Sequence, residues 1–211
     1  MKRNDLIDNL RALAILVVVF GHSIILYQYR WGIYTSVNDV PILNAVKNYI
    51  DVIQMPLFIS LSGYLYFKIQ GIERIIVFFV KKIRRLLVPF VAIGIFWMIP
   101  IRLFVEYPWY ENKEIFEIII KCLMLGQDCG HLWFLPFLFL AFMLSHFLAK
   151  IFKVIAFDET KCWWTLTFIA GLLYISKTFF QVSFLEIYHL NNVATYYIWF
   201  LVGGLLFRYQ D

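Results

Sequence analysis

The stretch from Asp8 to Ser23 is the feature that most restricts how this chain can fold. From Ala12 to Phe20 it holds no polar side chain. Such a segment is stable in hydrocarbon only when its own backbone satisfies every N–H and C=O group, as a helix does. The composition agrees, because 62% of the 211 residues are hydrophobic and 16% are charged. Soluble domains have roughly half apolar and a quarter charged residues, which excludes that class.

We therefore predict an all-α fold, a polytopic membrane helix bundle formed by residues 1–211 as a single domain. The apolar runs predict about six transmembrane helices, over 9–28, 45–67, 86–106, 132–152, 163–181 and 193–208. Segment 68–85 carries six basic residues against one acid, which makes it cytoplasmic by the positive-inside rule. Six spans then leave the N- and C-termini cytoplasmic. Residues 114–125 are too few to cross and predict an amphipathic or re-entrant helix.

The first helix carries an arginine and a histidine on one side. A helix advances about 1.5 Å and turns about 100° per residue, so Arg11 and His22 lie on nearly one face, roughly 16 Å apart. Asp8 is three residues before Arg11 and can contact it. Ionisable groups inside a bilayer cost at least about 2.5 kcal/mol each and generally line a functional cavity. We expect catalytic roles here, with His22 well inside the span as general base toward a hydroxyl.

Each of these groups also has a simpler interpretation. A lone histidine on a helix is commonly a packed core residue, and Asp8 with Arg11 could anchor a helix end at the lipid headgroups. The basic residues Lys82, Arg84 and Arg85 are explained by topology alone. They could also bind the phosphates of a cofactor, because guanidinium groups hold phosphate in bidentate fashion.

The remaining candidates concern the substrate. His131 and Trp133 fall at the predicted outer interface, where aromatic residues are routine but an indole face can also stack on a sugar. Ser62 precedes Gly63 in the second span, and helix packing is its simplest role, with substrate binding as the alternative. A serine-hydrolase site is excluded, since Ser62 lacks the strand-to-helix turn of a nucleophile elbow.

Charge and cysteine content exclude other classes of partner. Basic cytoplasmic loops account for the net charge of +5, so no nucleic-acid partner is needed. The three cysteines are an odd number and cannot form a fully paired disulfide framework. Cys122 and Cys129 could share a helix face, but two unpaired thiols are favoured. No cysteine spacing indicates a metal site, so no metal is expected.

Five motifs resemble the acyltransferase family 3 membrane proteins, in the same order along the chain. They are Asp8-Asn9-Leu10-Arg11-Ala12-Leu13-Ala14 with His22, Met55-Pro56-Leu57-Phe58 through Ser62-Gly63-Tyr64-Leu65, Lys82-Ile83-Arg84-Arg85-Leu86-Leu87-Val88-Pro89-Phe90, His131-Leu132-Trp133-Phe134-Leu135, and Phe200-Leu201-Val202-Gly203-Gly204. Any one of them is a weak signal. Their shared order along the whole chain makes the resemblance strong.

This resemblance implies O-acylation, usually O-acetylation, of an envelope polysaccharide or lipid-linked sugar in the bacterial cytoplasmic (inner) membrane. The donor would be acetyl-CoA, taken from the cytoplasmic side. His22 matches the catalytic candidate of the family, and Arg11 matches an arginine that supports cofactor binding or acyl transfer. Arg84 and Arg85 match the segment at the CoA-facing end. Membrane lipid and the glycan acceptor are then the expected partners.

The chain has fewer predicted helices than family members usually have. The resemblance therefore implies the N-terminal portion of the family fold, apparently truncated, with a partner or homo-oligomer supplying the missing helices. Two other functions are compatible with the same sequence. One is a non-enzymatic transporter or exporter of a polysaccharide intermediate, which would not bind acyl-CoA. The other is an inactive truncated remnant, which would be poorly retained in membranes without a partner.

Overall fold

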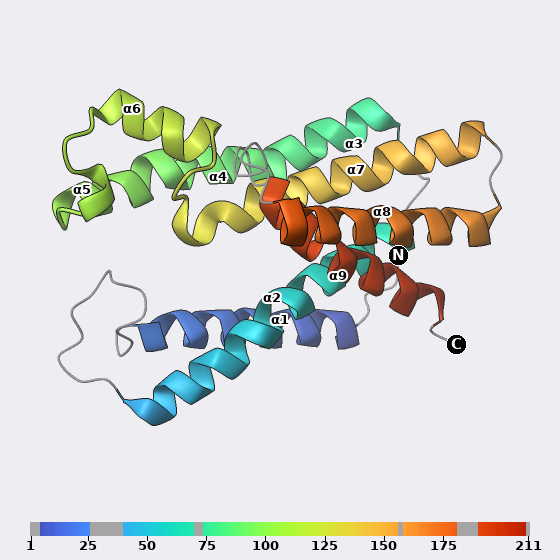
Figure 1. Ribbon diagram of the computed structural model, residues 1–211, viewed down its shortest axis with the longest axis horizontal. Coiled ribbons are helices and arrows are strands. Elements are labelled where there is room, and N and C mark those ends of the chain that lie inside the picture. Colours follow the sequence, from blue (N-terminus) through green and yellow to red (C-terminus); the bar gives the residue numbers. More distant parts are fainter. Residues whose placement is uncertain (1–4, 26–39, 70–73, 156–157, 181–189, 210–211) are drawn as a thin grey trace. The chain divides into compact units, whose positions relative to one another are not determined.

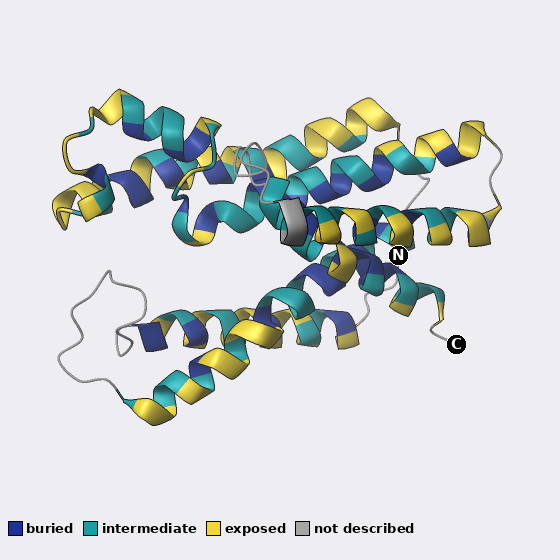
Figure 2. Ribbon diagram, viewed as in Figure 1, coloured by how far each residue is buried: buried dark blue, intermediate teal, exposed yellow. Residues whose placement is uncertain are grey.

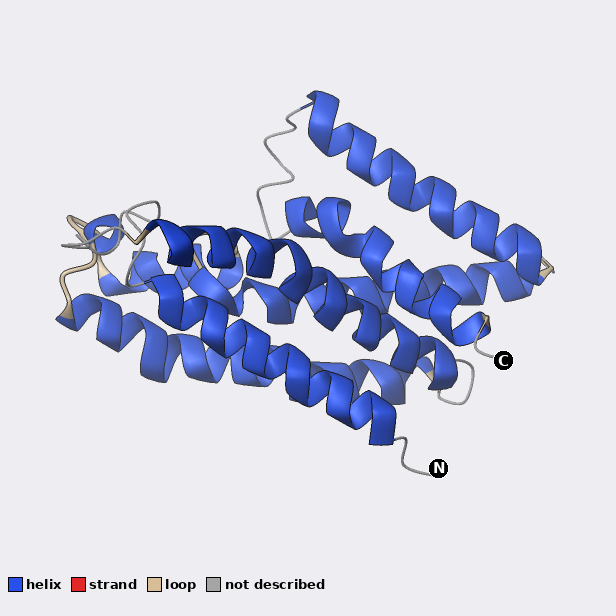
Figure 3. Cartoon of the chain, turned by 90° about the horizontal axis from the view of Figure 1, so that it is seen from below, coloured by secondary structure: helices blue, strands red, loops and turns tan. Residues whose placement is uncertain are grey.

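The computed structural model describes residues 5–25, 40–69, 74–155, 158–180 and 190–209. Within these ranges the regular structure is helical and contains no strand (Figure 3), which confirms the all-α prediction. The helices of Figure 1 are α1 (Asp5–Ile24), α2 (Pro41–Ile69), α3 (Ile75–Lys82), α4 (Val88–Ile93), α5 (Ile99–Phe104), α6 (Ile115–Ile119), α7 (Phe134–Val154), α8 (Glu159–Phe180) and α9 (Leu190–Arg208).

Five of the predicted spans are confirmed by length and composition in the described residues. These are Asp5–Ile24, Pro41–Lys68, Ile75–Phe104, Gly130–Val154 and Leu190–Arg208. The predicted span 163–181 does form a helix, α8, but α8 is not among the helices apolar enough to cross. Glu159, Lys161 and Lys177 are the charged residues along it. The six-span topology is therefore not confirmed in the described part of the chain.

The third span begins earlier than the sequence indicated. Helix runs from Ile75 to Phe104, so the C-terminal part of the predicted loop 68–85 is helical. Two π turns, Ile83–Leu87 and Gly94–Met98, interrupt the α geometry. Each comes just before a proline, Pro89 or Pro100. A proline ring collides with the carbonyl four residues earlier, and the wider turn relieves that collision without ending the helix.

The chain divides into two compact units, residues 1–68 with 199–211 and residues 69–198. The core of the first unit includes Ile7 and Ala14 from α1 with Leu61 and Tyr64 from α2. In this unit α2 also crosses the C-terminal half of α9 at very short range. A Cβ on Gly63 would lie 1.9 Å from the Phe200 carbonyl oxygen, so only a glycine permits this approach.

The core of the second unit is formed around the segment between the third and fourth spans. The short helix α6, with the π turn Ile120–Met124, packs against α4, α5 and the turn before α7. The buried residues of this core are Phe90, Met98, Ile99, Tyr110, Ile118, Cys122, Leu123, Cys129 and Leu132. The prediction that 114–125 is too short to span is confirmed. Figure 2 shows the buried faces of these elements in dark blue.

Candidate functional site

His22 lies in the last turn of α1 that the structure describes. Its ring is partly buried, and Nδ1 is 2.8 Å from the backbone oxygen of Val18, one turn earlier. A carbonyl oxygen can only accept, so this contact assigns the proton of the neutral ring to Nδ1 and the basic lone pair to Nε2. The sequence predicted a position well inside the span. In α1, which begins at Asp5 rather than at residue 9, His22 is seventeen residues after the first residue of the helix.

Arg11 lies toward the other end of the same unbroken helix, and its side chain is exposed. Its predicted separation from His22, roughly 16 Å along the axis, therefore holds. The predicted contact between Asp8 and Arg11 stays a prediction. A pair between exposed side chains is worth at most about 1 kcal/mol. Asp8 lies in the first turn of α1, where the positive end of the helix dipole stabilises a carboxylate.

A polar network on α2, in the same unit as His22, was not among the predicted site residues. Lys47 forms an ion pair with Asp51, and Gln54 Nε2 donates to Asp51 Oδ1 at 2.7 Å. Gln54 lies directly against Gly21, the residue before His22. The signal that could have revealed the network is the spacing of these three residues, which puts them on one helix face.

Ser62 also belongs to this unit, and its contacts favour the packing role. Its hydroxyl donates to the Phe58 carbonyl at 3.0 Å, within α2 itself. The neighbouring Ser60 hydroxyl donates to the Trp199 carbonyl of α9 at 2.9 Å. Gly63 supplies the close approach to the same helix. Nothing in this arrangement makes Ser62 a nucleophile.

The basic cluster lies in the second unit, around the first π turn of the third span. Arg84 and Arg85 are exposed, whereas Lys82 is partly buried. The Lys82 ammonium lies 3.2 Å from the ring centroid of Phe142 on α7, a cation–π contact. Since the helix rises about 1.5 Å per residue, a 30-residue helix is about 45 Å long and can reach beyond the hydrocarbon core. The arginines therefore belong to the part of the span that can lie among headgroups and solvent.

His131 and Trp133 occupy a 3-10 turn, Gly130–Trp133, immediately before α7. The two side chains lie in different environments, because His131 is exposed while Trp133 is partly buried. The Trp133 indole stacks on Tyr196 with ring centroids 5.3 Å apart. The indole also contacts the rings of Phe134 and Phe137, with centroids 6.2 Å and 5.9 Å away. Along α7, Trp133 lies nine residues from Phe142, so about 14 Å separates this turn from Lys82.

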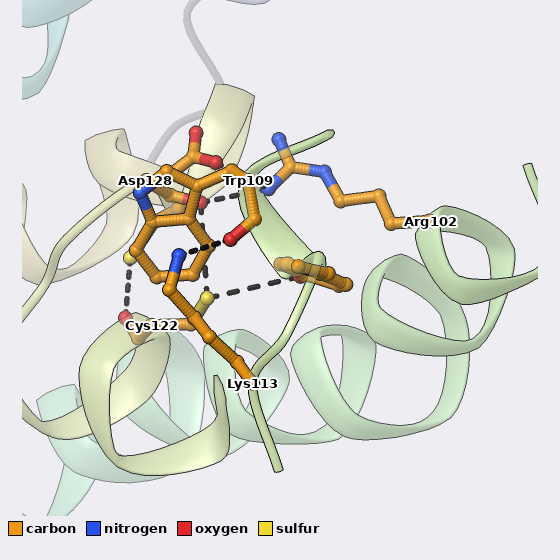
Figure 4. Close-up of polar contacts among 7 residues, drawn as sticks. Arg102, Trp109, Lys113, Cys122 and Asp128 are labelled. Carbon is orange, nitrogen blue, oxygen red and sulfur yellow. Dashed lines mark hydrogen bonds and ion pairs between the residues drawn. The ribbon is translucent and has the colours of Figure 1, made fainter. Parts of the chain in front are cut away.

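A partly buried arginine supports the segment that leads into this turn (Figure 4). Arg102 Nη1 donates to the Asp128 carbonyl at 2.8 Å and lies 3.4 Å from its carboxylate. The guanidinium also covers the Tyr107 ring, 4.5 Å from its centroid. Gly130, with φ of +52°, comes so close that a Cβ there would lie 2.7 Å from Arg102 Nη2. These contacts hold residues 128–130 and hence the direction in which His131 leaves the chain.

The two cysteines of this segment are unpaired, as predicted. The Cys129 thiol donates to the Cys122 carbonyl at 2.5 Å. Burial, aided by the neighbouring Cys122 and Asp128, raises the pKa of the Cys129 thiol to about 12. Burial likewise raises the pKa of Cys122. Both thiols are therefore held protonated at neutral pH and are poor nucleophiles.

This protonation predicts selective labelling by a thiol reagent. At about pH 8 a maleimide is expected to modify Cys162 in the folded protein, and Cys122 and Cys129 only after denaturation. Mass spectrometry of the labelled peptides checks this, and equal labelling of all three cysteines without denaturant would contradict it.

The same burial makes the stability of the fold depend on pH. The raised pKa of the folded-state Cys129 thiol stabilises the fold below the unfolded thiol pKa of about 8.5, and this contribution is lost as pH rises toward 12.

The model of the acyltransferase 3 family, described as an acyltransferase domain, matches residues 4–211. No curated protein and no solved structure matches the chain. The family match confirms the resemblance seen in the five motifs. Together with five helices apolar enough to cross a bilayer, it indicates a multi-pass membrane protein.

Proposed function

Because the chain belongs to the acyltransferase 3 family, we propose that it is an O-acyltransferase of the bacterial cytoplasmic membrane. It transfers an acyl group, most simply acetyl, from acyl-CoA to a hydroxyl of an envelope polysaccharide or lipid-linked sugar. The observation that carries this proposal is the family match over residues 4–211. The position of Arg11 and His22 on one unbroken helix supports it.

His22 is the general base of the proposed reaction. With its Nδ1–H held by the Val18 carbonyl, Nε2 accepts the proton of the acceptor hydroxyl. The hydroxyl oxygen then forms a bond to the thioester carbonyl carbon, and the carbon–sulfur bond to CoA breaks. The proton passes from the imidazolium to the leaving thiolate. The products are the O-acyl sugar and free CoA, and the reaction needs no further reactant.

The other residues receive supporting roles. Arg84 and Arg85, exposed nine and ten residues after the start of the third span, bind the phosphates of CoA, and Lys82 adds a nearby positive charge. Arg11 assists binding of the donor. His131, with Trp133 in the same turn, contacts the acceptor sugar. These assignments place the N-terminus and the basic cluster on the cytoplasmic side, where acyl-CoA is made.

The test is the acetyl content of the envelope glycans, measured by mass spectrometry. A strain that lacks the gene is compared with the same strain carrying the unchanged chain or an Arg84→Ala, Arg85→Ala double variant. We expect acetylation to return with the unchanged chain and to fall sharply with the double variant. Restored acetylation by a double variant at normal membrane levels would contradict phosphate binding by these arginines. Failure of the unchanged chain to restore acetylation, despite normal membrane levels, would contradict the proposed function itself and leave the exporter and the inactive remnant.

A further inference from the structure

A polar face on α2 lies beside the catalytic candidate His22 and has no role in the reaction described so far. Its members recur at spacings of three and four residues within one membrane span: Asn44, Lys47, Asn48, Asp51 and Gln54. At about 100° per residue these positions fall within a sector of roughly 120°. Five polar side chains on one side of a span are costly against lipid, so this face must border protein, water or a ligand.

The charges on this face are balanced. The Lys47 side chain is 1% exposed and forms its ion pair with Asp51 Oδ1. The same Oδ1 accepts the hydrogen bond from Gln54 Nε2. Both contacts fall on one carboxylate oxygen, while 41% of the Asp51 side chain remains exposed. The pair is electrically neutral.

A second acceptor is buried next to His22. Gln54 is 6% exposed, and its Oε1 has no hydrogen-bond partner among the described residues. A Cβ on Gly21 would lie 2.9 Å from this oxygen, so the amide carbonyl packs on the α1 backbone one residue before His22. A buried acceptor without a partner is uncommon, because it loses its bond to water and gains nothing in return.

We propose that Asp51 and Gln54 bind hydroxyl groups of the acyl acceptor, beside His22. This assignment rests on the proposed function and adds the acceptor-binding residues to it. Both atoms concerned, Asp51 Oδ2 and Gln54 Oε1, accept hydrogen bonds, so the ligand must donate them. A phosphate or carboxylate cannot do so, and the neutral Lys47–Asp51 pair offers no net charge to either. Neighbouring hydroxyls of a sugar ring match this pattern.

A metal ion does not suit the same place. The Lys47 ammonium already occupies the cation position at Asp51 Oδ1. The described residues also contain no group of three or more His, Cys, Asp or Glu side chains that could hold an ion. Entry of a hydroxyl requires the flexible Gln54 amide to rotate from Gly21, a change of side-chain rotamer and not of the helices.

The experiment measures transfer from radiolabelled acetyl-CoA by the purified full chain. Membranes from a strain lacking the gene serve as the source of unmodified acceptor. The primary variant is Gln54→Met, which keeps the side-chain length and the Lys47–Asp51 pair but removes the amide. The second is Lys47→Met with Asp51→Asn, which removes both charges together, because removing Asp51 alone would take away the carboxylate that balances a buried ammonium. Tyr49→Phe is the matched control, since Tyr49 is 74% exposed and about 160° away from Asp51 on the helix.

Loss of a hydrogen bond to the acceptor should raise its KM by about tenfold in Gln54→Met and up to about 100-fold in the double variant. The KM for acetyl-CoA should stay within about twofold in both, because the donor does not contact this face. A structural defect would instead lower the amount of active protein and change neither KM. Tyr49→Phe should match the unchanged protein.

The outcomes separate the two proposals. Unchanged acceptor KM in both variants, in a protein whose transfer still requires His22, would overturn acceptor binding by α2 and leave the proposed function standing. An equal rise in the KM for acetyl-CoA would also overturn it, since the face would then serve the donor. No transfer by the unchanged protein would overturn both proposals.

Discussion

Replacing His22 with alanine is expected to lower acyl transfer by about 10²- to 10⁴-fold, the usual contribution of a positioned general base. His22 can act as this base because its Nδ1–H donates to the Val18 carbonyl, which leaves the basic Nε2 directed away from the helix backbone. The loss should appear in kcat, since alanine removes the group that accepts the proton and not the contacts that bind donor or acceptor. Radiolabelled acetyl-CoA and membrane acceptor provide the measurement.

Ser23→Ala is the control for this variant. Ser23 is the next residue on α1, is exposed, and donates its hydroxyl to the Phe20 carbonyl at 2.7 Å. Its replacement disturbs the same helix turn without removing a base, so transfer should remain within about twofold. If His22→Ala retained transfer at normal membrane levels, a different residue would have to be the base. If both variants lost activity equally, His22 would be acting through the structure of the turn.

Replacing Gly63 with alanine is expected to cause a large loss of stability. The added Cβ would lie 1.9 Å from the Phe200 carbonyl oxygen, and a Cβ on Gly203 would lie 1.8 Å from the Ser60 carbonyl oxygen. Both obstacles are backbone atoms, so α2 and the C-terminal half of α9 would have to separate. Overpacking commonly costs 1–3 kcal/mol, and we expect about 3 kcal/mol or more here because no side chain can yield.

The fold supplies its own control in Gly171, on α8. A Cβ there meets nothing within 4 Å. Gly171→Ala should therefore be neutral or stabilise the helix by up to about 1 kcal/mol. Thermal unfolding of the purified proteins in one detergent compares the two glycine variants. Similar unfolding temperatures for Gly63→Ala and Gly171→Ala would show that α2 and α9 do not cross as the structure has them.

The local sequence pattern was sufficient to predict most of the helices, but not the residues at which they begin and end. The apolar runs predicted five of the candidate spans, because hydrocarbon leaves a crossing backbone few alternatives to helix. The start of the third span was predicted eleven residues too late, since Lys81, Lys82, Arg84 and Arg85 resemble a loop by composition. The π turns before Pro89 and Pro100 keep that helix continuous, and hydropathy does not report them.

For the candidate site, the sequence by itself determined which residues can do chemistry. The spacing of Arg11 and His22 on one helix follows from helix geometry alone, and the five motifs were enough to identify the family. Only the tertiary structure decided which side chains from other helices contact these residues. It put Tyr196 on one face of Trp133, Phe142 under Lys82, and Gln54 against the helix turn of His22. The physical reason is that periodicity fixes the face of a helix on which a side chain lies, whereas its partner comes from another helix, through packing that no local pattern contains.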